Sequence, residues 1–131
     1  MGMYTELFLD CHINAKLLSD NEKAIITYLF DYDNNDIDTP TIFPKHYFFR
    51  CSRWYMIGRG GSAYFDDDVP KSLTKNGDDW HIISRSDFKN YDSEIELFLY
   101  WFKPFIVNSD SNGVIGHYHY EEDCEPTLIY I

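Results

Sequence analysis

The sequence has few cysteines and no long apolar run. Its three cysteines, Cys11, Cys51 and Cys124, are an odd number at wide spacing, which argues against a disulfide framework. No CxxC pair is present, so the sequence does not indicate a zinc knuckle or a thioredoxin-type motif. No stretch approaches the ~18 apolar residues of a membrane-spanning helix, and the start, MGMYTELFLD, lacks the basic segment of a signal peptide. We therefore expect a protein of the reducing cytoplasm, without a membrane span.

Basic residues are also scarce. The chain has 11 Lys and Arg against 22 Asp and Glu, which gives a net charge of −11. A nucleic-acid-binding protein normally shows the opposite balance, because it must neutralise phosphates. We therefore expect no direct contact with nucleic acid, and a protein partner that is attracted to an acidic surface.

Aromatic residues, in contrast, are abundant. They make up 18% of the chain, with eleven Tyr, ten Phe and three Trp. A chain of 131 residues that is 44% hydrophobic can form one folded domain, which we take to span residues 1–131. One core of this size has little room for so many rings, so we expect some of them to form an interaction surface.

Periodic patterns predict two helices and several strands. Residues 4–13 alternate as in a strand with one buried side, with Leu7 and Leu9 on that side and Glu6 on the other. Ser19 and Glu22 have the spacing of a capping box, which predicts a helix that ends near residue 31. Three further strands are expected over 79–85, 114–122 and 126–131.

The strongest helix signal lies at 91–104, where Asp92 or Ser93 provides the N-cap and Pro104 ends the helix. Its apolar residues fall on one stripe, formed by Ile95, Phe98, Leu99 and Phe102. Residues 53–68 read as two aromatic runs around Arg-Gly-Gly, which is typical of a β-hairpin. The fold class we expect is α+β, with a mostly antiparallel sheet of about five to six strands and two helices packed on one face.

The segment GHYHYEEDCE offers a candidate metal site. On a strand, His117 and His119 lie on one face because side chains alternate, and Glu121 can join them. Two imidazoles and a carboxylate are suitable ligands for zinc or iron. The alternative is the solvated face of a strand, and a metal-dependent hydrolase would need a third ligand such as His12 or His81. We expect no cofactor.

A second candidate site combines aromatic and acidic residues. The run RWYMIGR is followed by SAYFDDD, so aromatic rings lie close in sequence to three consecutive carboxylates. Such rings can stack on a partner's side chains, although a core role for the tryptophan is the alternative. The residues that we predict to bind a partner are Trp54, Tyr55, Tyr64, Asp66, Asp67 and Asp68.

Several segments resemble a family of small acidic proteins from phages and prophages. They are FF..RW at 48–54, SAYF at 62–65, DFKNYDSEIELFLYWFKP at 87–104, and IGHYHYEE with PTLIY near the end. The resemblance implies an accessory protein of a mobile element that acts in the host cytoplasm. The family has no known activity, so the resemblance transfers no functional residue.

The function we expect is that of a non-enzymatic protein-binding module. Its sharper form is an inhibitor of a host nucleic-acid-handling protein, in which acidic side chains occupy a site built for phosphates. One alternative is a metal-dependent hydrolase that uses the His117 and His119 pair. Another is a structural homo-oligomer of a phage particle, with the exposed part of the 95–102 helix as a symmetric interface.

Overall fold

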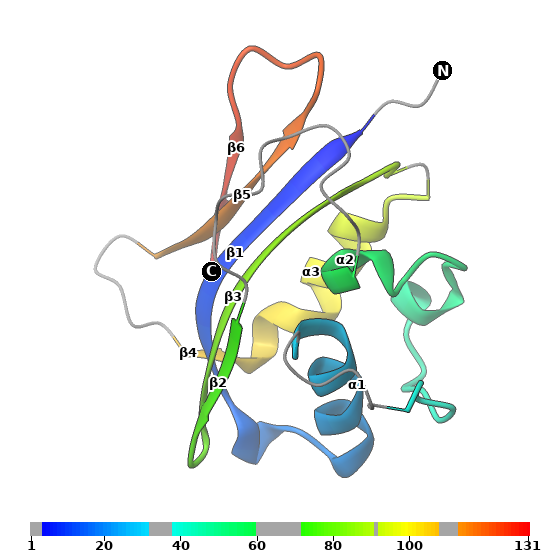
Figure 1. Ribbon diagram of the computed structural model, residues 1–131, viewed down its shortest axis with the longest axis vertical. Helices are drawn as coiled ribbons and strands as arrows, with labels where there is room; N and C mark the ends of the chain where they lie inside the picture. Colours follow the sequence, from blue (N-terminus) through cyan, green and yellow to red (C-terminus); the bar gives the residue numbers. More distant parts are fainter. Residues whose placement is uncertain (1–3, 32–37, 60–71, 91, 108–112) are drawn as a thin grey trace.

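In the computed structural model, a six-stranded antiparallel sheet carries the helices on one side (Figure 1). The structure describes residues 4–31, 38–59, 72–90, 92–107 and 113–131. The strand order is β2-β3-β1-β5-β6, and the short β4 also pairs with β1. This arrangement confirms the α+β prediction. The elements are β1 (Thr5–Asn14), α1 (Asp20–Phe30), α2 (Met56–Arg59), β2 (Ser72–Asn76), β3 (Asp79–Phe88), α3 (Glu94–Phe102), β4 (Ile106–Val107), β5 (Val114–Tyr120) and β6 (Thr127–Tyr130), with 3-10 turns η1 (Ala15–Leu17), η2 (Tyr47–Arg50) and η3 (Lys103–Phe105).

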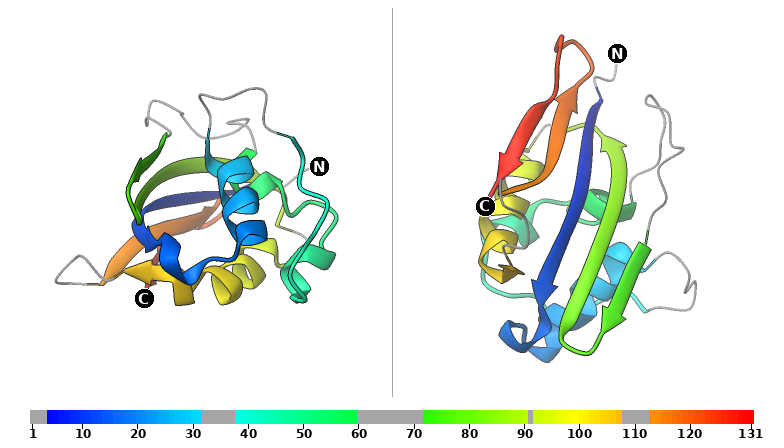
Figure 2. Two further views of the ribbon diagram at one scale, coloured as in Figure 1. Left: turned by 90° about the horizontal axis from the view of Figure 1, so that it is seen from below. Right: turned by 90° about the vertical axis from the view of Figure 1, so that its left-hand side faces the viewer.

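Strand β1 lies at the centre of the sheet. It pairs with β3 along its full length, from Thr5 opposite Phe88 to Asn14 opposite Asp79, and with β5 over its first half. The predicted alternation is confirmed, because Leu7, Leu9, Cys11 and Ile13 are all buried in the core. The right-hand view in Figure 2 looks onto the opposite face of the sheet. On that face, β1 carries the polar residues Glu6, Asp10 and His12.

The two predicted helices both form. In α1 the Ser19 hydroxyl accepts a hydrogen bond from the Glu22 backbone N–H, and the Glu22 carboxylate accepts one from the Ser19 N–H. These two bonds complete the expected capping box. The stripe of α3 is entirely buried, since Ile95, Phe98, Leu99 and Phe102 all belong to the core. No helix among the described residues has the length and apolarity needed to cross a membrane.

The start of α3 differs from the prediction. Ser93 occupies the N-cap position, but its backbone is left-handed, with φ of 58°, and its side chain makes no capping bond. Asn90 instead accepts a hydrogen bond from the Ile95 N–H at 3.0 Å, and the Glu94 carboxylate accepts one from the Asp92 N–H at 2.9 Å. One free N–H group of the first turn, that of Ile95, is thus satisfied by a residue that precedes the expected caps.

The predicted hairpin at 53–68 is wrong in its first arm, because Met56–Arg59 forms the short helix α2. Residues 60–71 lie outside the described part of the chain. Tertiary packing explains the helix: Ile57 is fully buried, and a Cβ atom added at Gly58 would collide with the Leu29 carbonyl of α1. Arg59 also donates from Nε to the Tyr28 carbonyl at 2.7 Å. Contacts with α1 therefore override the strand-like pattern.

Strand β2 was not predicted. It pairs with β3 through a tight turn in which Asn76 lies opposite Asp79, and Gly77 at the turn has a φ of 60°. Because Asn76 pairs with Asp79, the two-residue loop is Gly77-Asp78, and a Gly-Asp loop is a hairpin signal, since glycine readily adopts the positive φ that such tight turns require. The sequence therefore contained a signal for the turn, but β2 itself, SLTKN, is mostly polar and lacks the apolar alternation that predicts a strand.

Candidate binding groove and polar sheet face

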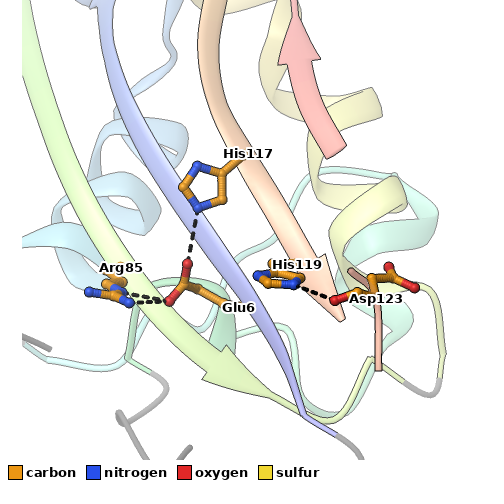
Figure 3. A network of polar contacts seen from close by, with 5 residues as sticks. All are labelled: Glu6, Arg85, His117, His119 and Asp123. Atoms are coloured by element: carbon orange, nitrogen blue, oxygen red, sulfur yellow. Dashed lines mark hydrogen bonds and ion pairs between the residues drawn. The ribbon is translucent and has the colours of Figure 1, made fainter. Parts of the chain in front are cut away.

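The face of the sheet opposite the helices carries a polar network centred on Glu6 (Figure 3). Arg85 on β3 donates through Nε and Nη2 to the Glu6 Oε2 atom, both at 2.6 Å. His117 on β5 donates from Nε2 to the other oxygen at 3.0 Å. Glu6 is only 4% exposed, so its charge depends on these two donors for compensation.

The predicted metal ligands His117 and His119 lie on one face of the sheet and Glu121 lies in the turn after β5, and all three are engaged separately. His119 donates from Nε2 to the Asp123 carbonyl at 2.9 Å, while the Nε2 atom of His117 is bonded to Glu6. Glu121 accepts a hydrogen bond from the Tyr4 N–H at 3.2 Å. Across the described ranges, no group of three or more His, Cys, Asp or Glu side chains is arranged to hold a metal ion.

Two further histidines lie on the same face but distant from His117. The rings of His12 and His81 stack with centroids 4.2 Å apart, and each ring donates to one carboxylate, Asp79 at 3.0 Å and Asp10 at 2.7 Å. His117 lies opposite Phe8, four residues before His12 on β1, which corresponds to about 13 Å along the strand. Neither ring is therefore within reach as a third ligand beside His117.

The cysteines do not form a nucleophilic site. Burial, followed by the nearby charge of Asp10, raises the pKa of the Cys11 thiol to about 12. Burial likewise raises the pKa of the Cys51 thiol, with smaller contributions from Glu94 and Asp92. Because the thiolate is the reactive form, both behave as inert core residues, and only Cys124 is exposed.

An open groove of about 600 Å³ lies between the segment before α2 and the outer side of α3. Two of its aromatic side chains are largely exposed, Tyr47 at 65% and Tyr100 at 76%. The residues that line it are Phe43, Pro44, Lys45, His46, Tyr47, Phe49, Arg50 and Tyr100. None of these is acidic, although acidic residues outnumber basic ones twofold in the chain, 22 to 11. The groove is therefore a local cationic and aromatic surface on an acidic protein.

The polar groups of the groove are oriented but incompletely satisfied. The guanidinium of Arg50 lies over the Tyr47 ring at 4.8 Å from its centroid. His46 accepts a hydrogen bond at Nδ1 from the Phe48 N–H, which places the ring hydrogen of the neutral form on Nε2. That Nε2 atom is buried and has no partner among the described residues. Burial also lowers the pKa of His46, which favours this neutral donor form.

A smaller cavity of about 440 Å³ lies at the end of β1. It contains charged groups of both signs, which pair with each other: His12 with Asp79 at 3.0 Å and Lys16 with Asp78 at 3.7 Å. Because these charges are already compensated, the cavity has less capacity to attract a charged ligand than the aromatic groove.

The predicted binding residues divide into two sets. Trp54 packs beside the groove, with ring centroids 5.2 Å from Phe43 and 5.9 Å from Phe49, and Tyr55 is exposed next to it. Tyr64 and Asp66–Asp68 lie outside the described residues.

The groove itself was not predicted from the sequence, because its lining comes from 43–50 and from one residue of α3. Two features of the sequence could have indicated the groove. One is the aromatic run at 47–49, and the other is that α3 has aromatic residues beyond those of its buried stripe.

Comparison of the chain with protein-family models, with curated proteins and with solved structures gives no significant match. The geometry of the groove and of the polar face therefore forms the basis for a functional proposal.

Proposed function

We propose that this protein is a non-enzymatic binding module that holds an acidic segment of a partner protein in the aromatic groove. One observation carries the proposal: the eight lining residues include Lys45, His46 and Arg50 and no acid, in a chain with a net charge of −11. Acidic residues outnumber basic ones twofold in the chain, so a lining with three basic side chains and no carboxylates reverses the overall balance. A groove from which they are excluded fits a ligand that is itself negative.

The chemistry of the groove suits a peptide better than a small ion. Tyr and Arg are among the side chains most enriched at binding hot spots, because they combine apolar contact with hydrogen bonding. Tyr47 and Tyr100 provide exposed rings for the apolar side chains of the ligand. Lys45 and Arg50 provide the positive charge for a ligand carboxylate.

A peptide-display library tests this proposal directly, because it offers the groove many different ligand sequences at once. We expect selection on the purified protein to enrich peptides that carry Asp or Glu beside an apolar residue. A selected peptide with a fluorescent label should lose at least about tenfold in affinity when Arg50→Glu or Tyr100→Ala is introduced, as measured by fluorescence anisotropy. Its affinity should also fall with added salt.

Matched changes elsewhere on the surface provide the controls. Lys16→Glu makes the same charge change at the smaller cavity, and Tyr130→Ala removes an exposed ring from β6. Both should leave peptide affinity unchanged. If selection yields no acidic peptides, or if Arg50→Glu binds the selected peptide as well as wild type, the groove is not the binding site and the proposal fails.

The net charge of −11 supports a second candidate, the inhibition of a host nucleic-acid-handling protein by acidic mimicry. Asp66, Asp67 and Asp68 are its central residues. The test is a pull-down from host lysate with wild type and with a variant that has all three changed to Asn. A nucleic-acid-handling protein captured by wild type alone would support mimicry. Equal capture by both proteins would exclude this acidic run as the site.

A further inference from the structure

Strand β6 has an outer edge that no described strand covers, because it is the last strand in the order β2-β3-β1-β5-β6. The direction of its backbone groups follows from one hydrogen bond. The Ile131 N–H donates to the Gly113 carbonyl at 3.1 Å, so Ile131 faces the β5 side. Backbone groups alternate along a strand, so Ile129 also faces β5, and the N–H and C=O groups of Leu128 and Tyr130 point outward.

The two edges of the sheet differ in how they are protected. At the other edge, β2 carries Lys75, whose ammonium donates to the Thr27 hydroxyl at 3.0 Å and lies over the Trp80 ring. A lysine on an edge strand is a common defence against pairing with another strand. The edge formed by β6 and Ile131 has no charged residue, and its exposed side chains include Leu128 at 49% and Tyr130 at 51%.

We infer that the β6 edge pairs with the β6 edge of a second copy of this chain. Pairing about a two-fold axis at Ile129 is antiparallel and places Leu128 of each copy opposite Tyr130 of the other. Both of these pairs involve the outward backbone groups, and each pair can exchange two hydrogen bonds. The edge is therefore complementary to itself, with a Leu–Tyr contact on each side of the axis.

Electrostatic repulsion between two copies also favours contact through this uncharged edge. Each chain has a net charge of −11, so most pairs of surfaces on two copies repel one another. Residues 126–131, PTLIYI, form a largely apolar stretch without charged side chains, in which every residue except the buried Ile129 is exposed. The predicted oligomer surface on α3 is a weaker candidate, because its apolar stripe is buried and Tyr100 is its only exposed large hydrophobic residue.

Sedimentation equilibrium between about 1 µM and about 500 µM tests this pairing. A reducing agent is included so that the exposed Cys124 does not crosslink the copies. We expect wild type to change from monomer to dimer within this range. Leu128→Lys adds a charge to the edge and should raise the dissociation constant at least about tenfold.

Two further variants separate edge pairing from misfolding and from other interfaces. Leu128→Pro removes an N–H that points away from β5, so the monomer should keep its circular dichroism spectrum while dimerisation is lost. Tyr100→Lys makes a similar change on α3 and should dimerise as wild type does. A wild type that stays monomeric throughout the range, or a dimer that persists in both Leu128 variants, would overturn the inference. Loss of the dimer in Tyr100→Lys alone would assign the interface to α3 instead.

Discussion

The two faces of β1 differ in what their side chains can contribute. On the helix side, Leu7, Leu9 and Ile13 are almost completely buried and belong to one continuous core with residues of α1 and α3. On the other side, Glu6, Asp10 and His12 form hydrogen bonds to side chains of β3 or β5. The same ten-residue strand thus supplies apolar burial to one layer and specific polar pairing to the other. The apolar side should dominate stability, and the polar side should fix the pairing of strands.

The largest expected effect comes from a substitution on the helix side. Phe98 in α3 is fully buried, and its ring stacks on that of Phe102 with centroids 4.7 Å apart. Phe98→Ala should lower the free energy of unfolding by about 3–5 kcal/mol, because it removes apolar contact and leaves a cavity. Urea denaturation provides the measurement. A loss below about 1 kcal/mol would show that this core collapses around the gap and that the comparison of faces is wrong.

The next effect is expected at the centre of the polar face. Glu6→Gln keeps the side-chain shape but removes the negative charge that Arg85 and His117 share. We expect a loss of about 1–3 kcal/mol in unfolding free energy, because Arg85 is left largely buried without its ionic partner. Glu122→Gln, at an exposed position after β5, is the matched control and should change stability by less than about 0.5 kcal/mol. Equal effects of the two changes would mean that the network adds no stability.

Raising the pH should lower the stability of the folded protein through the thiol of Cys11, which is buried on the helix side of β1. Its pKa is raised from 9.0 to about 12 in the folded protein, so between these values the unfolded chain releases a proton that the folded chain retains. The contribution of Cys11 to the free energy of unfolding is therefore fully present below pH 9. It falls by about 1.4 kcal/mol for each pH unit as the pH rises from 9 toward 12. Tyr and Lys residues also titrate there, so the measurement is the difference in slope between wild type and Cys11→Ala. Identical slopes would contradict the burial of the thiol.

The smallest effect is expected from the stacked histidines. His12 and His81 lie face to face at 4.2 Å, but both side chains and their carboxylate partners are partly exposed to solvent. His81→Ala should therefore cost less than about 1 kcal/mol at neutral pH in thermal denaturation. A loss comparable to that of Phe98→Ala would show that the polar face contributes as much to stability as the core.

The parts of the fold that the sequence predicted are those with a regular local pattern. The alternation of β1, the capping box of α1 and the stripe of α3 each depend on residues within one segment, and all three are confirmed. The short helix α2 depends on a distant contact, the close approach of Gly58 to Leu29, which no local pattern encodes. The sequence therefore indicated a hairpin where tertiary packing produces a helix.

The candidate site was predictable only in part, for a similar physical reason. Trp54 and Tyr55 were predicted to bind a partner. Trp54 contacts Phe43 of the groove, but neither Trp54 nor Tyr55 lines it, and their role stays a prediction. The groove itself combines residues 43–50 with Tyr100, which is on the side of α3 away from the apolar stripe. The sequence pattern of α3 distinguishes its buried side from its exposed side. It does not show which other segment of the chain lies next to the exposed side. The predicted role of Asp66–Asp68 stays a prediction.

The distribution of the three thiols has a practical consequence for spectroscopy. Cys11 and Cys51 are buried and their pKa values are raised, so a maleimide reagent at neutral pH should react first with the exposed Cys124. Cys124 lies in the turn between β5 and β6. The unsubstituted chain can thus carry one nitroxide or dye close to β6, and a distance between two such probes would report directly on how two copies are arranged.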